Sequence, residues 1–322
     1  MQTAVIGYPR IGTLRELKFA SEQYFRKEIE AGELLQTAKD LRKTHWLTQK
    51  EAGISFISCN DFSFYDNMLD AAVLFGIVPK RYKELQLSEL DTYFAMARGY
   101  QGDSGDVKAL AMKKWFNTNY HYIVPEVEDE MVIELKGNKL FAEYHEAKEL
   151  GITTKPTVIG AYTLLKLCRY TGTKKMADYV DVVSKAYRNL IVKCETEGID
   201  WLQFDEPALV QDMGQDEIHL FHKLYDAILA ADNKCHVLLQ TYFGDVRDIY
   251  EDLIQMPFAG IGLDFIEGKQ TVSLIKQFGF PQDKLLFAGL VNGKNIWKNH
   301  YEKTLQTMED FPLLCKRPRQ TN

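Results

Sequence analysis

Short apolar runs alternate with helical segments along the whole chain, and this alternation limits the possible folds more than any other feature. Runs with β-type composition lie near residues 4, 55, 121, 158, 202, 239, 262 and 286, and a helical segment follows each of them. Eight strand-helix units predict a single closed (β/α)8 barrel. A doubly wound open sheet is the alternative, but the opening glycines do not form the G-x-G-x-x-G pattern of dinucleotide-binding sheets.

The chain of 322 residues is longer than the ~250 residues of a typical barrel of this kind. The excess is explained by a hairpin and loop insertion near residues 99–141, which includes a predicted hairpin around Gly137-Asn138. A further helix is predicted early in the chain. Since no linker interrupts residues 1–310, we expect one barrel domain over that range.

Charge, hydropathy and cysteine content exclude several classes of protein. A net charge of -6 argues against a nucleic-acid-binding protein, and no apolar run approaches the ~20 residues that span a membrane. The five cysteines are scattered without a C-x-x-C pair, which favours free thiols in a reducing cytoplasm. We therefore expect a cytoplasmic chain that binds no nucleic acid, no membrane and no metal of its own.

The most informative stretch is Gly7–Lys18, where an apolar run ends in a glycine and proline turn and a helix begins. Arg15 and Lys18 lie three residues apart on the first turn of that helix. Cations are disfavoured at a helix N-terminus, so an anionic ligand would explain them. Two solvated surface charges remain the alternative.

Polar residues at the carboxyl ends of barrel strands are candidates for a functional site, because the active face forms there. Asp205 and Glu206 could supply a general acid and base, or they could cap the helix that begins at Pro207. The expected set is Arg15, Lys18, Asn60, Asp61, Asp66, Lys114, Asn119, His121, Asp205, Glu206, Gln240, Tyr242, Asp264, Asn292 and Lys294.

Two long motifs give the chain a specific resemblance. The segments 7–18 and 114–126 resemble the N-terminal half of cobalamin-independent methionine synthase, and the segments 204–209 and 287–297 agree with it. That family joins two (β/α)8 barrels and transfers a methyl group from 5-methyltetrahydropteroyltriglutamate to homocysteine. The resemblance implies that zinc, homocysteine and most of the folate site belong to the C-terminal barrel. It also implies a folate-binding role in this chain for Arg15, Glu16, Leu17, Lys18 and Lys114.

The departures from the family's catalytic barrel limit what this chain can do alone. Gln240-Thr241-Tyr242 stands where that barrel holds zinc through a His-x-Cys pair, Asp264 takes the acidic position, and Lys294 replaces a histidine. The resemblance therefore implies a folate-side domain with no catalytic residue and no zinc, inactive by itself, with residues 311–322 beginning a linker to a missing catalytic barrel. A non-catalytic scaffold barrel that only packs against the catalytic domain is the second hypothesis. An independent enzyme using Asp205 and Glu206 is the third.

Overall fold

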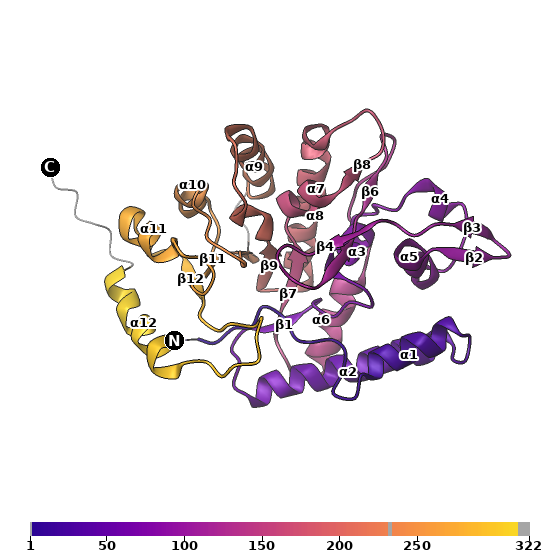
Figure 1. Ribbon diagram of the computed structural model, residues 1–322, viewed down its shortest axis with the longest axis horizontal. Helices are drawn as coiled ribbons and strands as arrows, with labels where there is room; N and C mark the ends of the chain where they lie inside the picture. Colours follow the sequence, from indigo (N-terminus) through magenta and orange to yellow (C-terminus); the bar gives the residue numbers. More distant parts are fainter. Residues whose placement is uncertain (1, 231–233, 315–322) are drawn as a thin grey trace.

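The computed structural model describes residues 2–230 and 234–314, and its centre is a curled six-stranded parallel sheet (Figure 1). The strands lie in the order β1-β7-β9-β10-β11-β12, and every neighbouring pair is parallel. The ring centroids of Phe56, beside β1, and Phe287, in β12, are 5.1 Å apart, so curling brings the two edges of the sheet together. The strands are β1 (Ile57–Cys59), β7 (Thr154–Ile159), β9 (Trp201–Asp205), β10 (His236–Gln240), β11 (Gly260–Asp264) and β12 (Leu285–Gly289).

Helices connect these strands and pack on the outside of the sheet (Figure 1). The longest crossover helix, α8 (Val180–Glu197), buries the apolar stripe that the sequence predicts and ends at Gly198, whose φ of 73° is left-handed. Tyr187 of α8 packs on Phe204 of β9, and both are fully buried in the main core. The other helices around the sheet are α6 (Lys139–Glu149), α7 (Ala161–Leu167), α9 (Gln215–Ile228), α10 (Tyr250–Gln255), α11 (Thr271–Phe278) and the short η1 (Met176–Tyr179) and η2 (Pro207–Val210).

The N-terminal third adds helices and hairpins to this unit. The helices α1 (Glu16–Phe25) and α2 (Ala31–Glu51) pack against each other, and α2 also contacts β1 and α6. Two antiparallel hairpins lie inside the predicted 99–141 insertion. The remaining elements of this part are α3 (Asn67–Leu74), α4 (Lys80–Lys83), α5 (Glu89–Arg98), β2 (Tyr100–Gly102), β3 (Gly105–Val107), β4 (Met112–Lys114), β5 (His121–Ile123) and β6 (Glu126–Val127), which pairs with β8 (Arg169–Tyr170).

Two of the eight predicted strands differ in the structure. The run near residue 4 forms a single parallel bridge between Ala4 and Phe56. The run near residue 121 is β5, which pairs antiparallel with β4, while β1 pairs directly with β7. The predicted turn at Gly137-Asn138 is also wrong, because Asn138 precedes the first residue of α6. A dense polar and aromatic segment forms β-structure in either kind of sheet, so its composition could not identify its partner.

The last described helix is α12 (Tyr301–Leu314), which follows β12 and continues past residue 310, the expected end of the barrel domain. The expected linker at residues 311–322 begins inside this helix, and residues 315–322 lie outside the described residues. The linker therefore stays a prediction. No described helix combines the length and apolar character needed to cross a membrane.

Candidate functional site

Hydrogen bonds and ring stacking hold the loop at residues 7–10 against the carboxyl end of β1. The Tyr8 amide donates to Asp61 Oδ2 at 2.6 Å, and the Tyr8 ring stacks on His45 with centroids 4.4 Å apart. The Arg10 guanidinium donates to the carbonyl oxygens of Ser63 and Phe64 at 2.9 and 3.0 Å. These contacts fix the glycine and proline turn against the residues that follow β1, and they set the position of α1.

The start of α1 carries four of the five residues that the resemblance assigns to folate binding. Arg15 is exposed, its φ is 63°, and among the described residues its guanidinium has no hydrogen-bond or ion-pair partner. Lys18 is also exposed, and its ammonium lies 3.7 Å from Glu22 in a surface pair. Glu16 instead accepts the Leu14 amide at 3.0 Å, and Leu17 is 1% exposed. Arg15 therefore carries the unpaired cation of this stretch and Lys18 a cation in an exposed ion pair, while Leu17 holds the helix to the core.

Lys114 lies on a different element. It is exposed on β4, opposite His121 of β5, and it lines a shallow hollow of about 460 Å³ together with Gln211 and Phe243. No hydrogen bond, ion pair or shared cavity joins it to the described part of α1. The structure brings Arg15 and Lys18 together, and it places Lys114 separately beside the mouth of the sheet.

A cavity of about 770 Å³ with both polar and apolar lining residues lies at the carboxyl ends of β10, β11 and β12. Lys294 closes one side through an ion pair of 2.9 Å with Glu267 and a hydrogen bond of 2.7 Å to Asn117. Asp264 accepts three backbone amides, from Phe243, Ile266 and Glu267, at 2.7 to 3.0 Å. Its carboxylate therefore organises the loops around the cavity.

The donor atoms at this mouth do not fit a zinc ion. The end of β10 supplies the amide of Gln240 and the hydroxyl groups of Thr241 and Tyr242, whereas zinc prefers thiolate, imidazole and carboxylate ligands. Across residues 2–230 and 234–314, no group of three His, Cys, Asp or Glu side chains could hold a metal ion.

Asp205 and Glu206 do not form an acid–base pair, because the two side chains are held in different places. Glu206 is fully buried at the N-terminus of α7 and accepts the amides of Tyr162 and Thr163 at 2.9 and 2.7 Å. Its other partners are the hydroxyl groups of Thr163, at 2.6 Å, and Tyr225. Glu206 therefore caps a helix, although the capped helix is α7 and not the predicted one beginning at Pro207.

Asp205 belongs to a chain of polar groups inside the sheet that the sequence did not reveal. Gln203 donates to Asp205 at 2.6 Å and accepts from Lys155, and the Tyr242 hydroxyl donates to the other Asp205 oxygen at 3.2 Å. Burial lowers the pKa of Lys155 to about 8 and raises that of Asp205 to about 7. Alternation along Thr154–Ile159 could have placed Lys155 and Thr157 on one face, but the predicted strand begins at Thr157.

The other predicted site residues have mixed locations. Asp66 caps α3 by accepting the Leu69 amide at 2.9 Å, and it also accepts the Ile123 amide at 2.9 Å. Asn60 is buried with a φ of 59° and donates to the Thr157 carbonyl at 2.8 Å. His121 is exposed, and Asn119 and Asn292 line the mouth cavity. Asp66 and Asn60 therefore hold the fold around the site.

The raised pKa of Asp205 predicts how stability depends on pH. Between about pH 4 and pH 7 the folded chain keeps a proton on Asp205 that the unfolded chain releases, so the free energy of unfolding falls as pH rises through this window. We expect Asp205→Asn to reduce this decline in the free energy of unfolding. A proton that the folded chain keeps and the unfolded chain releases accounts for about 1.4 kcal/mol per pH unit. Urea unfolding at a series of pH values measures it.

Asp129→Asn is the matched control, since the pKa of Asp129 is lowered by the amides of Thr173 and Lys174. Its influence is expected only in the acid range near and below pH 4, where stability is lost as pH falls. A decline between pH 4 and pH 7 that is equal in Asp205→Asn and in the parent chain would contradict the assignment.

The fold and the mouth together define the class of protein. A curled parallel sheet with outer helices and polar residues at the strand carboxyl ends is typical of α/β proteins that bind small molecules at that end. A solved B12-independent methionine synthase from Shewanella sp. W3-18-1 has a similar fold, with a TM-score of 0.66 at 14% identity over 89% of this chain and 80% of that one. This likeness shows the fold alone.

Sequence comparison identifies the family. The N-terminal domain of cobalamin-independent synthase matches residues 2–314. The chain is 55% and 56% identical to the 5-methyltetrahydropteroyltriglutamate–homocysteine methyltransferases of Streptococcus gordonii and Streptococcus thermophilus, over 97% of its own length. The chain belongs to the cobalamin-independent methionine synthase family and corresponds to its N-terminal domain. It spans 42% of the length of these curated relatives.

Proposed function

We propose that this chain is the folate-side half of an enzyme that moves a methyl group from 5-methyltetrahydropteroyltriglutamate to homocysteine. Within it, Arg15 and Lys18 bind the glutamate tail of the folate, Lys114 extends the contact, and the whole forms a barrel domain. The observation that carries the proposal is the exposed Arg15 guanidinium, which has no partner among the described residues. A triglutamate tail bears several carboxylates, and arginine binds carboxylates in a bidentate geometry.

The backbone of Arg15 supports a binding role. A left-handed φ of 63° is costly for a residue other than glycine, and such strain concentrates at functional sites. The Arg15 amide donates to the Gly12 carbonyl at 3.2 Å, within the turn fixed by the Tyr8 and Arg10 contacts. The turn therefore holds Arg15 in place before any ligand arrives, which reduces the entropy lost on binding.

Removing the cations should weaken binding of the tail. We expect Arg15→Ala and Lys18→Ala each to lower affinity for tetrahydropteroyltriglutamate by roughly 5- to 20-fold, the value of a charge-assisted hydrogen bond. Affinity for the monoglutamate should change little, because it lacks the outer carboxylates. Isothermal titration calorimetry at low ionic strength measures both, and Lys114→Ala is expected to give a smaller loss of the same kind.

Arg26→Ala is the matched control, since Arg26 follows the same helix but is already paired with Glu28 at 2.6 Å. If Arg15→Ala and Arg26→Ala both leave the affinity for the triglutamate unchanged, the proposed role of Arg15 in binding the tail would be overturned.

That outcome would favour the second hypothesis, a non-catalytic scaffold barrel that only packs against the catalytic domain. One observation supports it. Large apolar side chains stand exposed around the mouth cavity, as expected of a face that another domain covers. They are Ile6, Tyr120, Ile266 and Val291.

We place zinc, the homocysteine site and the chemical step in the part of the enzyme that this chain lacks. The amide and hydroxyl donors at the end of β10 support this division, because they cannot supply the thiolate and imidazole ligands of a zinc site. The 322-residue chain should accordingly form no methionine when supplied with zinc, homocysteine and methyl donor. Methionine formation by the purified chain would contradict the division.

A further inference from the structure

A second cavity of about 300 Å³ lies inside the carboxyl ends of β1, β7 and β9, beneath the loop at residues 7–9. Its polar lining includes Asp61, Thr157, Asp205 and Tyr242, and no lysine or arginine is among its lining residues. It is distinct from the mouth cavity, although Ile6 and Tyr242 line both. Nothing proposed for the folate tail makes use of this space.

Two of the lining carboxylates lack a cation. Asp61 accepts the Tyr8 amide and the Ser58 hydroxyl at 2.6 and 2.9 Å, both on Oδ2, so Oδ1 has no partner among the described residues. Asp205 is bound only to the neutral groups of Gln203 and Tyr242.

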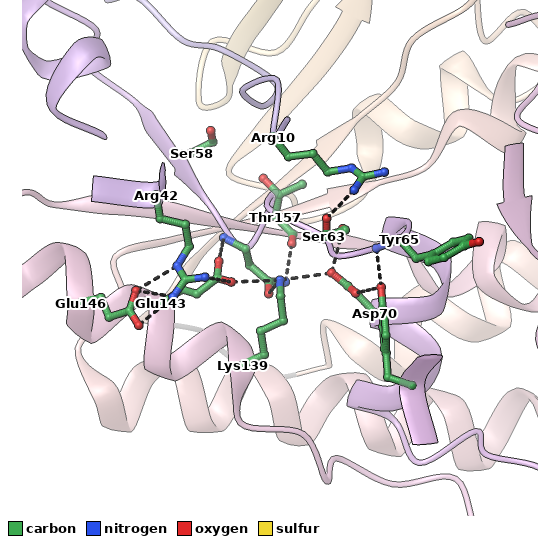
Figure 2. A network of polar contacts seen from close by, with 12 residues as sticks. Arg10, Arg42, Ser58, Ser63, Tyr65, Asp70, Lys139, Glu143, Glu146 and Thr157 are labelled. Atoms are coloured by element: carbon green, nitrogen blue, oxygen red, sulfur yellow. Dashed lines mark hydrogen bonds and ion pairs between the residues drawn. The ribbon is translucent and has the colours of Figure 1, made fainter. Parts of the chain in front are cut away.

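The third lining carboxylate differs, because Asp70 forms an ion pair of 3.1 Å with Lys139 (Figure 2). Asp61 therefore brings to the cavity a carboxylate oxygen that no described cation contacts, while Asp205, whose pKa is raised by burial, keeps its proton up to about pH 7.

An unpartnered hydroxyl group points to a ligand. Thr157 Oγ1 is buried and has no hydrogen-bond partner, the one such side-chain atom in the described part of the chain. Thr157 is 8% exposed and lines the cavity, and Figure 2 shows its hydroxyl directed away from the Lys139 network. A buried hydroxyl without a partner is costly, so its presence on this wall favours a bound polar group.

We propose that this cavity binds a small organic cation through a primary ammonium group. An ammonium group carries three donors, and three residues that line the cavity offer acceptor oxygens from different segments: Asp61 after β1, Thr157 in β7 and Asp205 in β9. The lining carboxylates disfavour an anion, and the Lys155 ammonium is held at Gln203 and leaves the cavity free. The volume admits a molecule of a few heavy atoms. The proposal is independent of the folate role.

Ethanolamine and its neutral analogue ethylene glycol provide the test, because they differ chiefly in the ammonium group. The unfolding temperature of the 322-residue chain should rise with ethanolamine concentration and stay unchanged with ethylene glycol, and the dependence yields a dissociation constant. Asp61→Asn is expected to weaken ethanolamine binding at least ~10-fold, and Thr157→Val roughly 5-fold. Equal effects of the two compounds, or of ethanolamine and potassium ions, would overturn the proposal.

Thr154→Val is the matched control, because Thr154 is buried on the same strand but its hydroxyl already donates to Cys59 Sγ at 3.1 Å. It should leave ethanolamine binding intact. Thr157→Val breaks no hydrogen bond within the described chain, so it should not lower the unfolding temperature of the ligand-free protein. If Asp61→Asn proves unstable, the folded Thr157→Val variant can still be used to test the site. Unchanged ethanolamine binding in Thr157→Val would count against the site.

Discussion

Lys139→Met is expected to lower the free energy of unfolding by about 3 kcal/mol, because it removes the cation of the buried Asp70 and leaves the buried Glu143 with only a longer ion pair of 3.8 Å to Arg42. The Lys139 ammonium lies 3.1 Å from Asp70 and 3.2 Å from Glu143, and it donates to Asn60 Oδ1 at 2.9 Å (Figure 2). The Lys139 side chain is 33% exposed, but those of Asp70 and Glu143 are 8% and 4% exposed. The loss therefore arises chiefly from the carboxylates, and urea unfolding at neutral pH measures it.

Lys80→Met is the matched control, since its ion pair with Glu84 is 3.6 Å long and fully on the surface. It should change stability by less than about 0.5 kcal/mol. Adding Glu143→Gln to Lys139→Met should recover part of the loss, because it removes one of the two buried carboxylates that lost the Lys139 ammonium. A Lys139→Met loss no larger than that of Lys80→Met would show that the network contributes little to folding.

This network also explains how the site is built from distant segments. Asn60 directly follows β1 and Asp70 lies in α3, whereas Lys139 and Glu143 belong to α6. The Glu143 carboxylate accepts the Asn60 amide at 3.0 Å, so the ion cluster holds α6 to the residues that carry the opening loop. The position of Arg15 thus depends on charges more than a hundred residues further along the chain.

The sequence predicted the elements whose patterns are local. Five strand-and-helix units after residue 150 have the expected type and order, because each combines a short buried run with a helix of clear apolar spacing. The stripe of α8 and its terminating Gly198 are the best example. The partner of β5 could not be predicted, since strand pairing depends on contacts between segments and leaves little trace within one of them.

The candidate site shows the same limit. Asp264 and Lys294 were expected at the carboxyl ends of strands and do line the mouth cavity, because strand order alone fixes that position. The sequence did not indicate Lys155 as a site residue, because a lysine next to Pro156 resembles a loop residue until its strand register is known. The helix that Glu206 caps could not be predicted, because its four donors come from Tyr162, Thr163 and Tyr225 on other elements.

Glu206→Ala is expected to cause a loss of about 4 kcal/mol or more, since it leaves four donors unpaired in a fully buried place. The N-terminus of α7 lies so close to the carboxylate that a Cβ on Gly160 would lie 2.2 Å from Glu206 Oε1. Urea unfolding and the loss of α7 amide protection in hydrogen exchange measure the effect.

Glu206→Gln tests whether the loss of stability comes from the missing helix cap or from the removed side-chain volume. It keeps the shape of the side chain but turns a donor toward groups that are themselves donors, so we expect about half the loss of Glu206→Ala. Glu33→Gln is the surface control, because Glu33 caps α2 by accepting the Glu30 amide at 3.2 Å in an exposed turn, and it should cost less than about 1 kcal/mol. A stable Glu206→Ala chain with α7 still protected would mean that other residues cap this helix, and the buried carboxylate would then need another explanation.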